Sequence, residues 1–501
     1  MQQRPAAAIS GPWAVAIGGA IVVSFFAVLF ALALVRPLCC ADDAGYAVVA
    51  RSLAEGRGYR STLAYSSAAA AGDLFDPRIG TGPASILPAA AAIALAGAQP
   101  ALPGVLHVAH VLALLLLAIA VVAAPLAPSR RAALAALFVL LVLITGTYHL
   151  EHWYALLGEV PAALCLIVAT GLWARREEKG RGWLAGAACG VAVLHKLVAL
   201  FGALALPLSL LVRAIAGATP ARRRARDAAA WTGGILAPLL VFELWKWAAL
   251  GGAGWLANQR ATFGFLSSQG LGEPAPAALG ALLVERGDQL AERFALSPLL
   301  ALLTLPLAFL ALGRAEGRLR TAGRTLLLAA ALEAVYWLFL SIGWPRYLYV
   351  GLVIHLFAIA LAVAATRGRA WRAALLVVTV AAVVPGLPRL RLPFAQLAAA
   401  RHSEASELAA ARRVAAVIRA EAPVAPILTE NFAQVATLEY LAEQPGRFRN
   451  IDSRDVATAP GQLFIVHDSY RFSHGPEHER LLARCAEVTL VDGPYRLYRC
   501  R

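Results

Sequence analysis

Long apolar segments constrain this chain more than any other feature. Of its 501 residues, 60% are hydrophobic and only 15% are charged, whereas about 25% of the residues of a soluble protein are charged. Many of the apolar runs reach the roughly 20 residues that a helix needs to cross a bilayer. The sequence therefore predicts an α-helical polytopic membrane protein. Its first apolar run, 13–35, is too long for a cleaved signal peptide and is expected to be an anchor.

Basic residues indicate how the chain is oriented. Almost all of them are arginines, and they gather in the clusters 130–131, 175–181, 222–224, 314–320 and 367–369. Arginine-rich loops stay on the cytoplasmic side of a membrane, so these clusters are expected inside. They also account for the formal net charge of +15, and no nucleic-acid partner is expected.

The apolar segments between these clusters predict about eleven membrane-spanning helices. A weaker run, 84–98, is assigned to the membrane interface, because only then do Arg130 and Arg131 fall inside. The pattern makes 1–390 the membrane domain, with a first outer loop at about 36–84 and a long outer loop after 247. The expected spans are approximately 13–35, 102–125, 133–148, 156–174, 183–195, 197–212, 229–247, 296–312, 326–343, 348–365 and 373–385.

The C-terminal segment, 391–501, predicts a small α/β domain outside the membrane. It alternates pieces with the pattern of helices and pieces with the pattern of strands. An amphipathic helix is expected at 403–421, strands at 425–428 and 463–466, and a hairpin of 487–491 with 495–499.

The cysteines have no spacing typical of a metal site. The predicted hairpin brings Cys485 and Cys500 opposite each other, so a disulfide between them is expected if this end lies in an oxidising compartment. Cys39 and Cys40 are not expected to pair with each other, because adjacent cysteines form a bridge with difficulty.

Two adjacent carboxylates, Asp42 and Asp43, follow the first span and begin a helical pattern. Gly56 and Gly58 end that pattern, so a helix along the outer membrane surface is expected. One reading makes one aspartate an N-cap that interacts favourably with the helix dipole. That reading explains one carboxylate better than two, and the alternative is a catalytic role.

Three further charged residues are expected at the same membrane face. Glu159 lies near the outer start of the 156–174 span, Lys196 lies in an outer turn, and Arg346 lies between aromatic residues. The structural alternatives are an acid at a helix N-terminus, a lysine extending to the interface, and an arginine anchor. Together with the aspartates they supply carboxylates that accept a proton and cations that hold a phosphate. This combination suits glycosyl transfer from a polyprenyl-phosphate sugar.

The motifs resemble those of the integral-membrane C-type (GT-C) glycosyltransferases, the superfamily of the protein O-mannosyltransferases and of the aminoarabinose and RgtA-like lipopolysaccharide sugar transferases. In that superfamily an acidic pair opens the first outer loop, commonly with Glu as its second member, and a Thr-Lys step and an Arg-Tyr step follow later in the chain. The matching segments here are Asp42-Asp43-Ala44-Gly45-Tyr46, Asp76-Pro77, Thr81-Gly82-Pro83, Glu159-Val160-Pro161, His195-Lys196 and Arg346-Tyr347.

The resemblance implies roles for individual residues. Asp42 would be the catalytic base, supported by Asp43 and Glu159, while Lys196 and Arg346 would bind the donor phosphate. Arg260, in the long outer loop, is a weaker candidate for the same task. The implied enzyme moves a sugar from a polyprenyl-phosphate donor to a glycolipid, polysaccharide or protein acceptor. It would sit in the plasma (inner) membrane with its site and C-terminal domain facing the periplasm.

Some relatives bind a divalent metal near the first loop, so a metal is possible, but no convincing ligand set is found here. Two groups have suitable residue types, and both are more simply explained as exposed loop residues. They are His149 and His152 near Glu151, and His474 and His478 with Asp468.

Two functions of other classes compete with the enzyme. A lipid or sugar transporter or flippase would use Glu243, Glu333 and His355, which lie in apolar segments. The chain shows no inverted repeat and no paired helices broken by Gly or Pro, which are typical of transporters. A non-catalytic assembly subunit of the same fold is the third possibility.

Overall fold

Helices build the membrane domain, and a five-stranded sheet builds the C-terminal domain. The structure, a computed structural model, describes residues 11–60, 74–77, 79–145, 150–215, 220–271, 279–341, 343–400, 404–421, 427–429, 435–442, 448–450, 458–467, 476–485 and 487–501. The helical elements up to residue 400 are α1 (Gly11–Val35), α2 (Ala41–Ala54), α3 (Pro83–Ala96), α4 (Leu102–Val122), α5 (Pro128–Thr145), α6 (Glu151–Tyr154), α7 (Glu159–Trp173), α8 (Arg181–His195), α9 (Ala199–Ala203), α10 (Ala205–Ile215), α11 (Ala221–Leu271), α12 (Leu279–Phe294), α13 (Pro298–Gly313), α14 (Gly317–Val335), η2 (Tyr336–Leu340), η3 (Pro345–Leu348), α15 (Tyr349–Ala365), α16 (Arg369–Val383), η4 (Val384–Arg391) and α17 (Leu392–Ala400).

Each of the eleven predicted spans contains a helix, but not every helix is long enough to cross a bilayer alone. Within the described residues, seven helices have the necessary length and apolar composition, and the pair α12 and α13, bent by 88°, gives an eighth if it acts as one span. Helix α7 and the α9–α10 segment are apolar but shorter. Every residue of α7 is buried, so protein surrounds it and its length need not match the bilayer. The chain is a multi-pass membrane protein.

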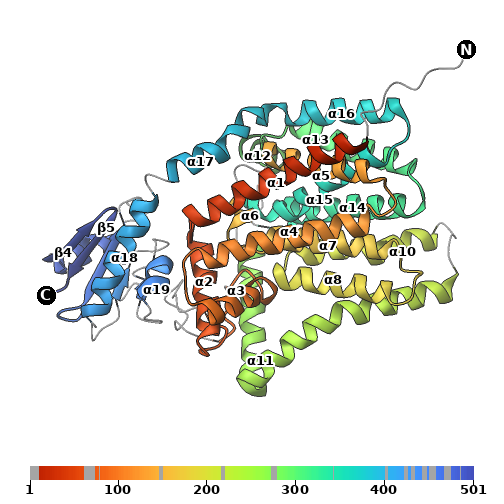
Figure 1. The fold of residues 1–501 in the computed structure, drawn as a ribbon. Coiled ribbons are helices and arrows are strands. Elements are labelled where there is room, and N and C mark those ends of the chain that lie inside the picture. The colour runs from red at the N-terminus through yellow and green to blue at the C-terminus, as the bar shows by residue number, and fades with distance from the viewer. Residues whose placement is uncertain are drawn as a thin grey trace, which may run out of the picture.

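The long outer loop expected after 247 is helical over most of its described length. Helix α11 continues to Leu271, and α12 follows at Leu279–Phe294. The apolar pattern ends near Trp247, which is why the sequence predicted a loop there. The chain instead turns at Gly251, whose φ of 67° lies in the left-handed region that glycine adopts without strain. The two halves of α11 therefore meet at an angle (Figure 1).

The C-terminal domain has the predicted α/β character. Its strands β1 (Ile427–Thr429), β2 (Phe448–Asn450), β3 (Leu463–His467), β4 (Glu487–Asp492) and β5 (Tyr495–Arg499) form a sheet in the order β2-β1-β3-β5-β4. β1 is parallel to β2 and β3, whereas β5 is antiparallel to β3 and β4. The described helices of this domain are α18 (Glu404–Glu421), α19 (Val435–Ala442) and α20 (Pro476–Arg484). The predicted helix, the two predicted strands and the hairpin are confirmed.

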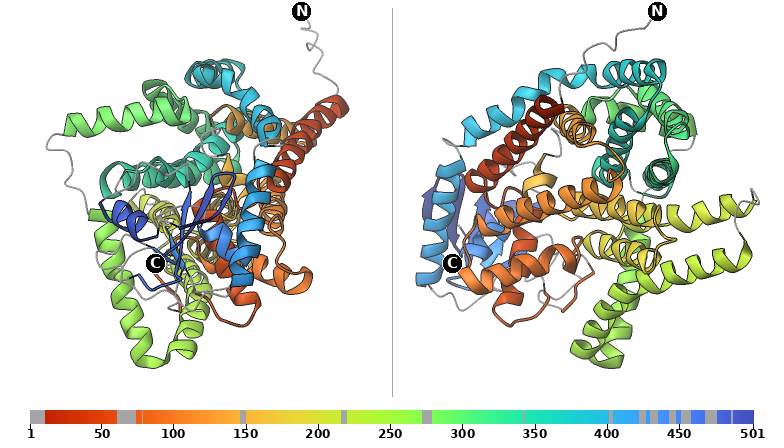
Figure 2. Two further views of the ribbon diagram at one scale, coloured as in Figure 1. Left: turned by 90° about the vertical axis from the view of Figure 1, so that its left-hand side faces the viewer. Right: turned by 45° about the vertical axis from the view of Figure 1, so that its right-hand side comes forward.

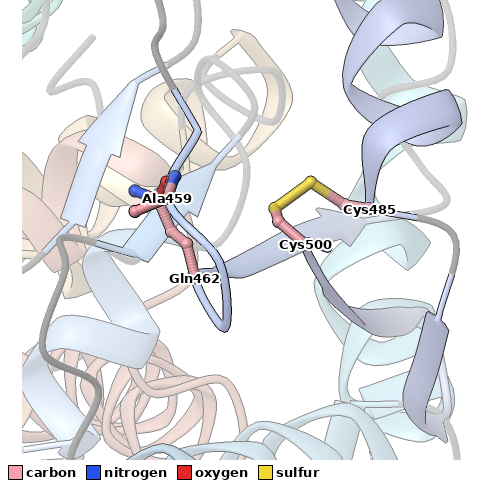
Figure 3. Close-up of a disulfide and its surroundings, with 4 residues drawn as sticks. All are labelled: Ala459, Gln462, Cys485 and Cys500. Carbon is pink, nitrogen blue, oxygen red and sulfur yellow. A yellow bond between two sulfur atoms is a disulfide. The ribbon is translucent and has the colours of Figure 1, made fainter.

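The predicted disulfide is also present. Cys485 follows α20 and Cys500 follows β5, and the two sulfur atoms are bonded (Figure 3). The backbone N–H of Cys500 also donates to the carbonyl oxygen of Gln462, at 2.8 Å. The bridge therefore ties α20 to the end of the sheet.

The C-terminal domain packs against α2 at one end of the helix bundle (Figures 1 and 2). The Arg51 side chain, buried on α2, donates to the carbonyl oxygen of Tyr440 on α19 and lies 5.6 Å from the centre of its ring. The Tyr440 hydroxyl donates in turn to the carbonyl oxygen of Gln99, at 3.2 Å. The helix that begins with the acidic pair is thus held between the bundle and the C-terminal domain.

Three arginine-rich segments meet beyond the last residue of α7, at the end of that helix away from Glu159. Glu178, between α7 and α8, pairs at 2.8 Å with Arg175 and with Arg318 of α14. Arg176 forms a buried pair with Asp227 of α11 at 3.2 Å. Three segments far apart in sequence therefore share one face of the molecule.

Two glycines clamp the turn that follows α8. A Cβ atom on Gly82 would lie 2.0 Å from the carbonyl oxygen of Leu194, and one on Gly158 would lie 2.1 Å from that of His195. The N–H of Gly82 also donates to the His195 carbonyl at 3.0 Å. The backbone before Lys196 is therefore held between Gly82 and Gly158. Only a residue without a Cβ atom can approach it so closely at these two positions.

We predict that Gly158→Ala destabilises the protein by about 3 kcal/mol, the upper end of the usual cost of overpacking. The φ of Gly158 is −88°, so alanine fits the backbone conformation and the clash with His195 is the source of the loss. Thermal unfolding in detergent micelles measures the effect. Gly19→Ala is the control, because a Cβ there meets nothing within 4 Å. Equal stability of the two variants would contradict the clamp.

Candidate functional site

The two carboxylates of the acidic pair have different partners. Asp42 and Asp43 lie in the first turn of α2, and the N-cap of this helix is Cys40, so neither aspartate is the cap that the structural alternative required. Asp42 Oδ2 pairs with Arg346 Nη1 at 2.5 Å, although the two residues are 304 positions apart. About a third of each side chain is exposed, so the pair can be reached by a ligand.

Arg346 is held by its aromatic neighbours as well as by Asp42. Its guanidinium carbon lies 4.9 Å from the ring centre of Trp344 and 5.5 Å from that of Tyr347. Such contacts favour a fixed, partly desolvated cation. These ring contacts do not test the membrane-anchor alternative, and the ion pair with Asp42 is a separate feature of the same side chain.

Asp43 is an anchor for α2. It is 3% exposed, and its carboxylate accepts the backbone N–H groups of Cys39, at 3.0 Å, and of Leu156, at 2.7 Å. Burial raises the pKa of Asp43 to about 6, although these hydrogen bonds act to lower it. The side chain joins the start of α2 to the segment that leads into α7.

Glu159 and Lys196 form a second, fully buried pair. Glu159 begins α7, as the helix-terminus alternative expects, and its Oε1 lies 2.8 Å from Lys196 Nζ. His152 Nδ1 lies 3.2 Å from Oε2 of the same carboxylate. Lys196 is 5% exposed, so it does not extend to the interface as a membrane-anchoring lysine would. Its charge is compensated inside the protein.

The structure brings five of the six candidate residues together. Glu159 is close enough to the Asp42–Arg346 pair to interact with Arg346 electrostatically. Asp43 joins the same region through Leu156. Arg260 does not join it: its side chain is exposed on α11 beyond the kink, and it forms no ion pair with the other five. Its assignment to the donor phosphate gains no support from its position.

The sequence did not predict the aromatic and histidine cluster behind Glu159. His152 was expected to be an exposed loop residue, but it is buried. The ring centres of His152 and Tyr349 are 4.9 Å apart, and the Tyr349 hydroxyl accepts the indole N–H of Trp153 at 2.7 Å. These residues are buried and follow no motif. The sequence contained one signal for Tyr349: it follows Arg346 by about one helical turn, which places it near the same site.

The described residues contain no group of three His, Cys, Asp or Glu side chains that could hold a metal ion. His152 lies against Glu159 instead. His149, Asp468 and His474 lie outside the described residues, as does the side chain of His478. The possible metal stays untested, and the described residues alone form no site for one.

The three residues of the transporter alternative have separate local partners. Glu243 accepts hydrogen bonds from Trp255, at 2.8 Å, and from Lys246, at 3.0 Å, both in α11. Glu333 accepts the backbone N–H of Gly202 at 2.8 Å, and His355 lies 2.8 Å from the Thr304 hydroxyl. These contacts join neighbouring helices or the two halves of α11. They do not link the three residues into one path.

The fold matches those of solved membrane glycosyltransferases. ArnT from Cupriavidus metallidurans, an aminoarabinose transferase, is 14% identical in its apo crystal structure, with a TM-score of 0.59 over 96% of this chain and 97% of that chain. The same protein bound to undecaprenyl phosphate gives a TM-score of 0.61, at 14% identity and 98% coverage of both chains. The apo oligosaccharyltransferase of Archaeoglobus fulgidus gives 0.53, at 12% identity, over 86% of this chain and 64% of that chain.

No protein-family model and no curated protein matches the chain by sequence. The structural likeness nevertheless extends over nearly all of it. The chain has the GT-C fold of the integral-membrane glycosyltransferases, which confirms the fold that its motifs predicted. It resembles ArnT along the full length of both proteins.

We predict strong energetic coupling between Glu159 and Lys196. Each of Glu159→Gln and Lys196→Met should cost about 3–5 kcal/mol, because each leaves a buried partner without its countercharge. The double variant should cost clearly less than the sum of the two, as measured by thermal unfolding in micelles. The Arg367–Glu316 pair, in which both side chains are exposed, is the control and should show a coupling below about 1 kcal/mol. Additive losses at Glu159 and Lys196 would contradict the buried pair.

We predict that Asp43 makes stability depend on pH. Its pKa of about 6 in the folded protein exceeds the ordinary value of 3.8, so the folded state binds the proton more tightly. The associated stabilisation, about 3 kcal/mol, is complete below pH about 4 and is lost as the pH rises through about 6. Unfolding midpoints compared between wild type and Asp43→Asn across this window measure it. An unchanged pH dependence in the variant would refute the assignment.

Proposed function

We propose that the protein is a membrane glycosyltransferase that moves a sugar from a polyprenyl-phosphate donor to an acceptor on the outer membrane face. The observation that carries the proposal is the junction of Asp42 with Arg346, next to the Glu159–Lys196 pair. It provides a partly exposed carboxylate and two cations at the outer end of the helix bundle. Those are the groups that displacement at a phosphate-linked sugar requires.

In the proposed reaction, Asp42 accepts the proton of the acceptor hydroxyl. The acceptor oxygen then attacks the anomeric carbon, and the bond from that carbon to the phosphate oxygen breaks. The departing lipid phosphate gains negative charge, which Arg346 binds in bidentate geometry and Lys196 supports as a point charge. Because this is one direct displacement, the product has inverted configuration at the anomeric carbon.

The fold supports a lipid-linked donor. ArnT, whose fold is similar over the whole chain, has been solved with undecaprenyl phosphate. The cluster lies at the end of the bundle opposite the arginine-rich loops (Figure 1), so by the positive-inside rule it faces away from the cytoplasm. We place the protein in the inner membrane, with its site and C-terminal domain in the periplasm and a glycolipid, polysaccharide or protein as acceptor.

The decisive experiment is Asp42→Asn in the full-length protein. Loss of the base should lower transfer by about 10²- to 10⁴-fold, because Asn cannot accept the proton. Cells without the gene first identify the sugar, as the one missing from their envelope glycolipids or glycoproteins. Transfer by each variant is then measured in membranes as incorporation of that sugar. Glu55→Gln is the matched control: it removes a carboxylate from the opposite end of the first outer helix, where Glu55 pairs with Arg51 and Arg57, and should retain transfer.

Retained transfer in a well-expressed Asp42→Asn variant would overturn the base assignment. Cells that lack the gene but show unchanged envelope sugars, with altered movement of a lipid or sugar across the membrane, would favour the transporter. That activity should then depend on Glu243 or Glu333. An envelope defect that Asp42→Asn rescues fully would favour the assembly subunit.

A further inference from the structure

Two thiols lie together at the start of the helix that carries the acidic pair. Cys39 and Cys40 are both partly exposed, and the Cys39 thiol donates a hydrogen bond to Cys40 Sγ over 3.5 Å. This separation is about 1.5 Å longer than the sulfur–sulfur bond of a disulfide. The sequence suggested that adjacent cysteines would not pair, but their two sulfur atoms lie within hydrogen-bonding distance of each other.

The dithiol contacts the acidic pair through the backbone. The N–H of Cys39 donates to Asp43 at 3.0 Å, and the carbonyl of Cys40 accepts the first hydrogen bond of α2, from Ala44. The peptide between the two thiols is therefore flanked by both of these bonds. Any change in its geometry alters how α2 begins and how Asp43 is held.

The same face of the protein already carries a disulfide. The domain with the Cys485–Cys500 bridge packs on α2 through Tyr440 and Arg51. An environment that oxidises that pair therefore also reaches Cys39 and Cys40. Cys165 and Cys189 differ from them, because both are buried in helices of the bundle.

We propose that Cys39 and Cys40 form a redox-sensitive dithiol, which a small disulfide or a thiol–disulfide oxidase closes into a bridge between adjacent residues. The Cys40 thiolate attacks the oxidant RSSR, forming a mixed disulfide and releasing one thiolate RS⁻. Cys39 then loses its proton and attacks the Cys40 sulfur, releasing the second RS⁻. In total, two thiols are oxidised and one external disulfide is reduced to two RSH.

The hydrogen bond makes Cys39 the second thiol to react. Donation of its proton to Cys40 Sγ raises the pKa of the Cys39 thiol. Because the thiolate is the nucleophile, Cys39 attacks only after it has lost this donated proton. Closure then confines the Cys39–Cys40 peptide to an eight-membered ring and disturbs the N–H that Asp43 accepts. We expect the closed form to transfer sugar several-fold more slowly, and this expectation rests on the proposed function.

The chemical test uses the full chain in micelles, first reduced and then treated with oxidised glutathione. Wild type should lose the mass of two hydrogen atoms from the peptide that holds both cysteines and should resist labelling by a maleimide until it is reduced. Cys39→Ser and Cys40→Ser should each carry one glutathione instead. Before oxidation, phenylarsine oxide should block labelling of the peptide that holds both cysteines in wild type, and of that peptide in neither single variant, because a trivalent arsenical needs both thiols.

Two glutathione adducts on wild type, or full labelling of both thiols after oxidation, would overturn the dithiol. These readouts do not depend on sugar transfer, so they remain valid if the proposed function fails. The coupling is tested separately, by transfer before oxidation, after oxidation and after reduction. A reversible loss in wild type that is absent from the double variant Cys39→Ser/Cys40→Ser supports it. Closure with unchanged transfer contradicts it.

Discussion

The end of the helix bundle next to the C-terminal domain depends on the buried ion pair between Glu159 and Lys196. A charge inside a membrane protein is costly unless a partner compensates it, and here the two charges come from different helices. Glu159 begins α7, and Lys196 follows α8. To bring them within 2.8 Å, the backbone before Lys196 must pass next to Gly158, with no room for a side chain between them. The sequence constraints near this pair follow from that requirement.

The two ion pairs also define an electrostatic starting state. Each proposed phosphate-binding cation already has a carboxylate partner, Asp42 for Arg346 and Glu159 for Lys196. A lipid phosphate that enters must therefore compete with a carboxylate for Arg346. Success in that competition would release Asp42 from its cation and leave it available to accept a proton. Donor binding and activation of the base would then be linked by a shared partner, without any large movement of the fold.

Much of this architecture could be predicted from the sequence, because the bilayer imposes simple patterns. Apolar length located the helices, and alternation identified the hairpin that carries the second disulfide cysteine. The helix beyond the kink at Gly251 was missed because the apolar pattern ends near Trp247 and the residues that follow were read as a loop. The charge pairs were also beyond reach: Asp42 and Arg346 are 304 residues apart, and no local pattern records which carboxylate meets which cation. Arg260 illustrates the same limit, since residue type and an expected loop do not determine whether a side chain lies near the other candidates.

The contact between Arg51 and Tyr440 has a mechanical consequence. Arg51 lies about two and a half helical turns from Asp42 along α2, and a short helix of this kind transmits displacement and rotation along its axis. A displacement of the C-terminal domain would therefore move α2 and the acidic pair in its first turn. A molecule that binds to that domain and shifts α2 would change the free energy of the arrangement around Asp42. By reciprocity, a donor bound near Asp42 would change the affinity of the domain for that molecule by the same factor. Under the proposed function, binding to the C-terminal domain and sugar transfer would thus be linked through one short helix.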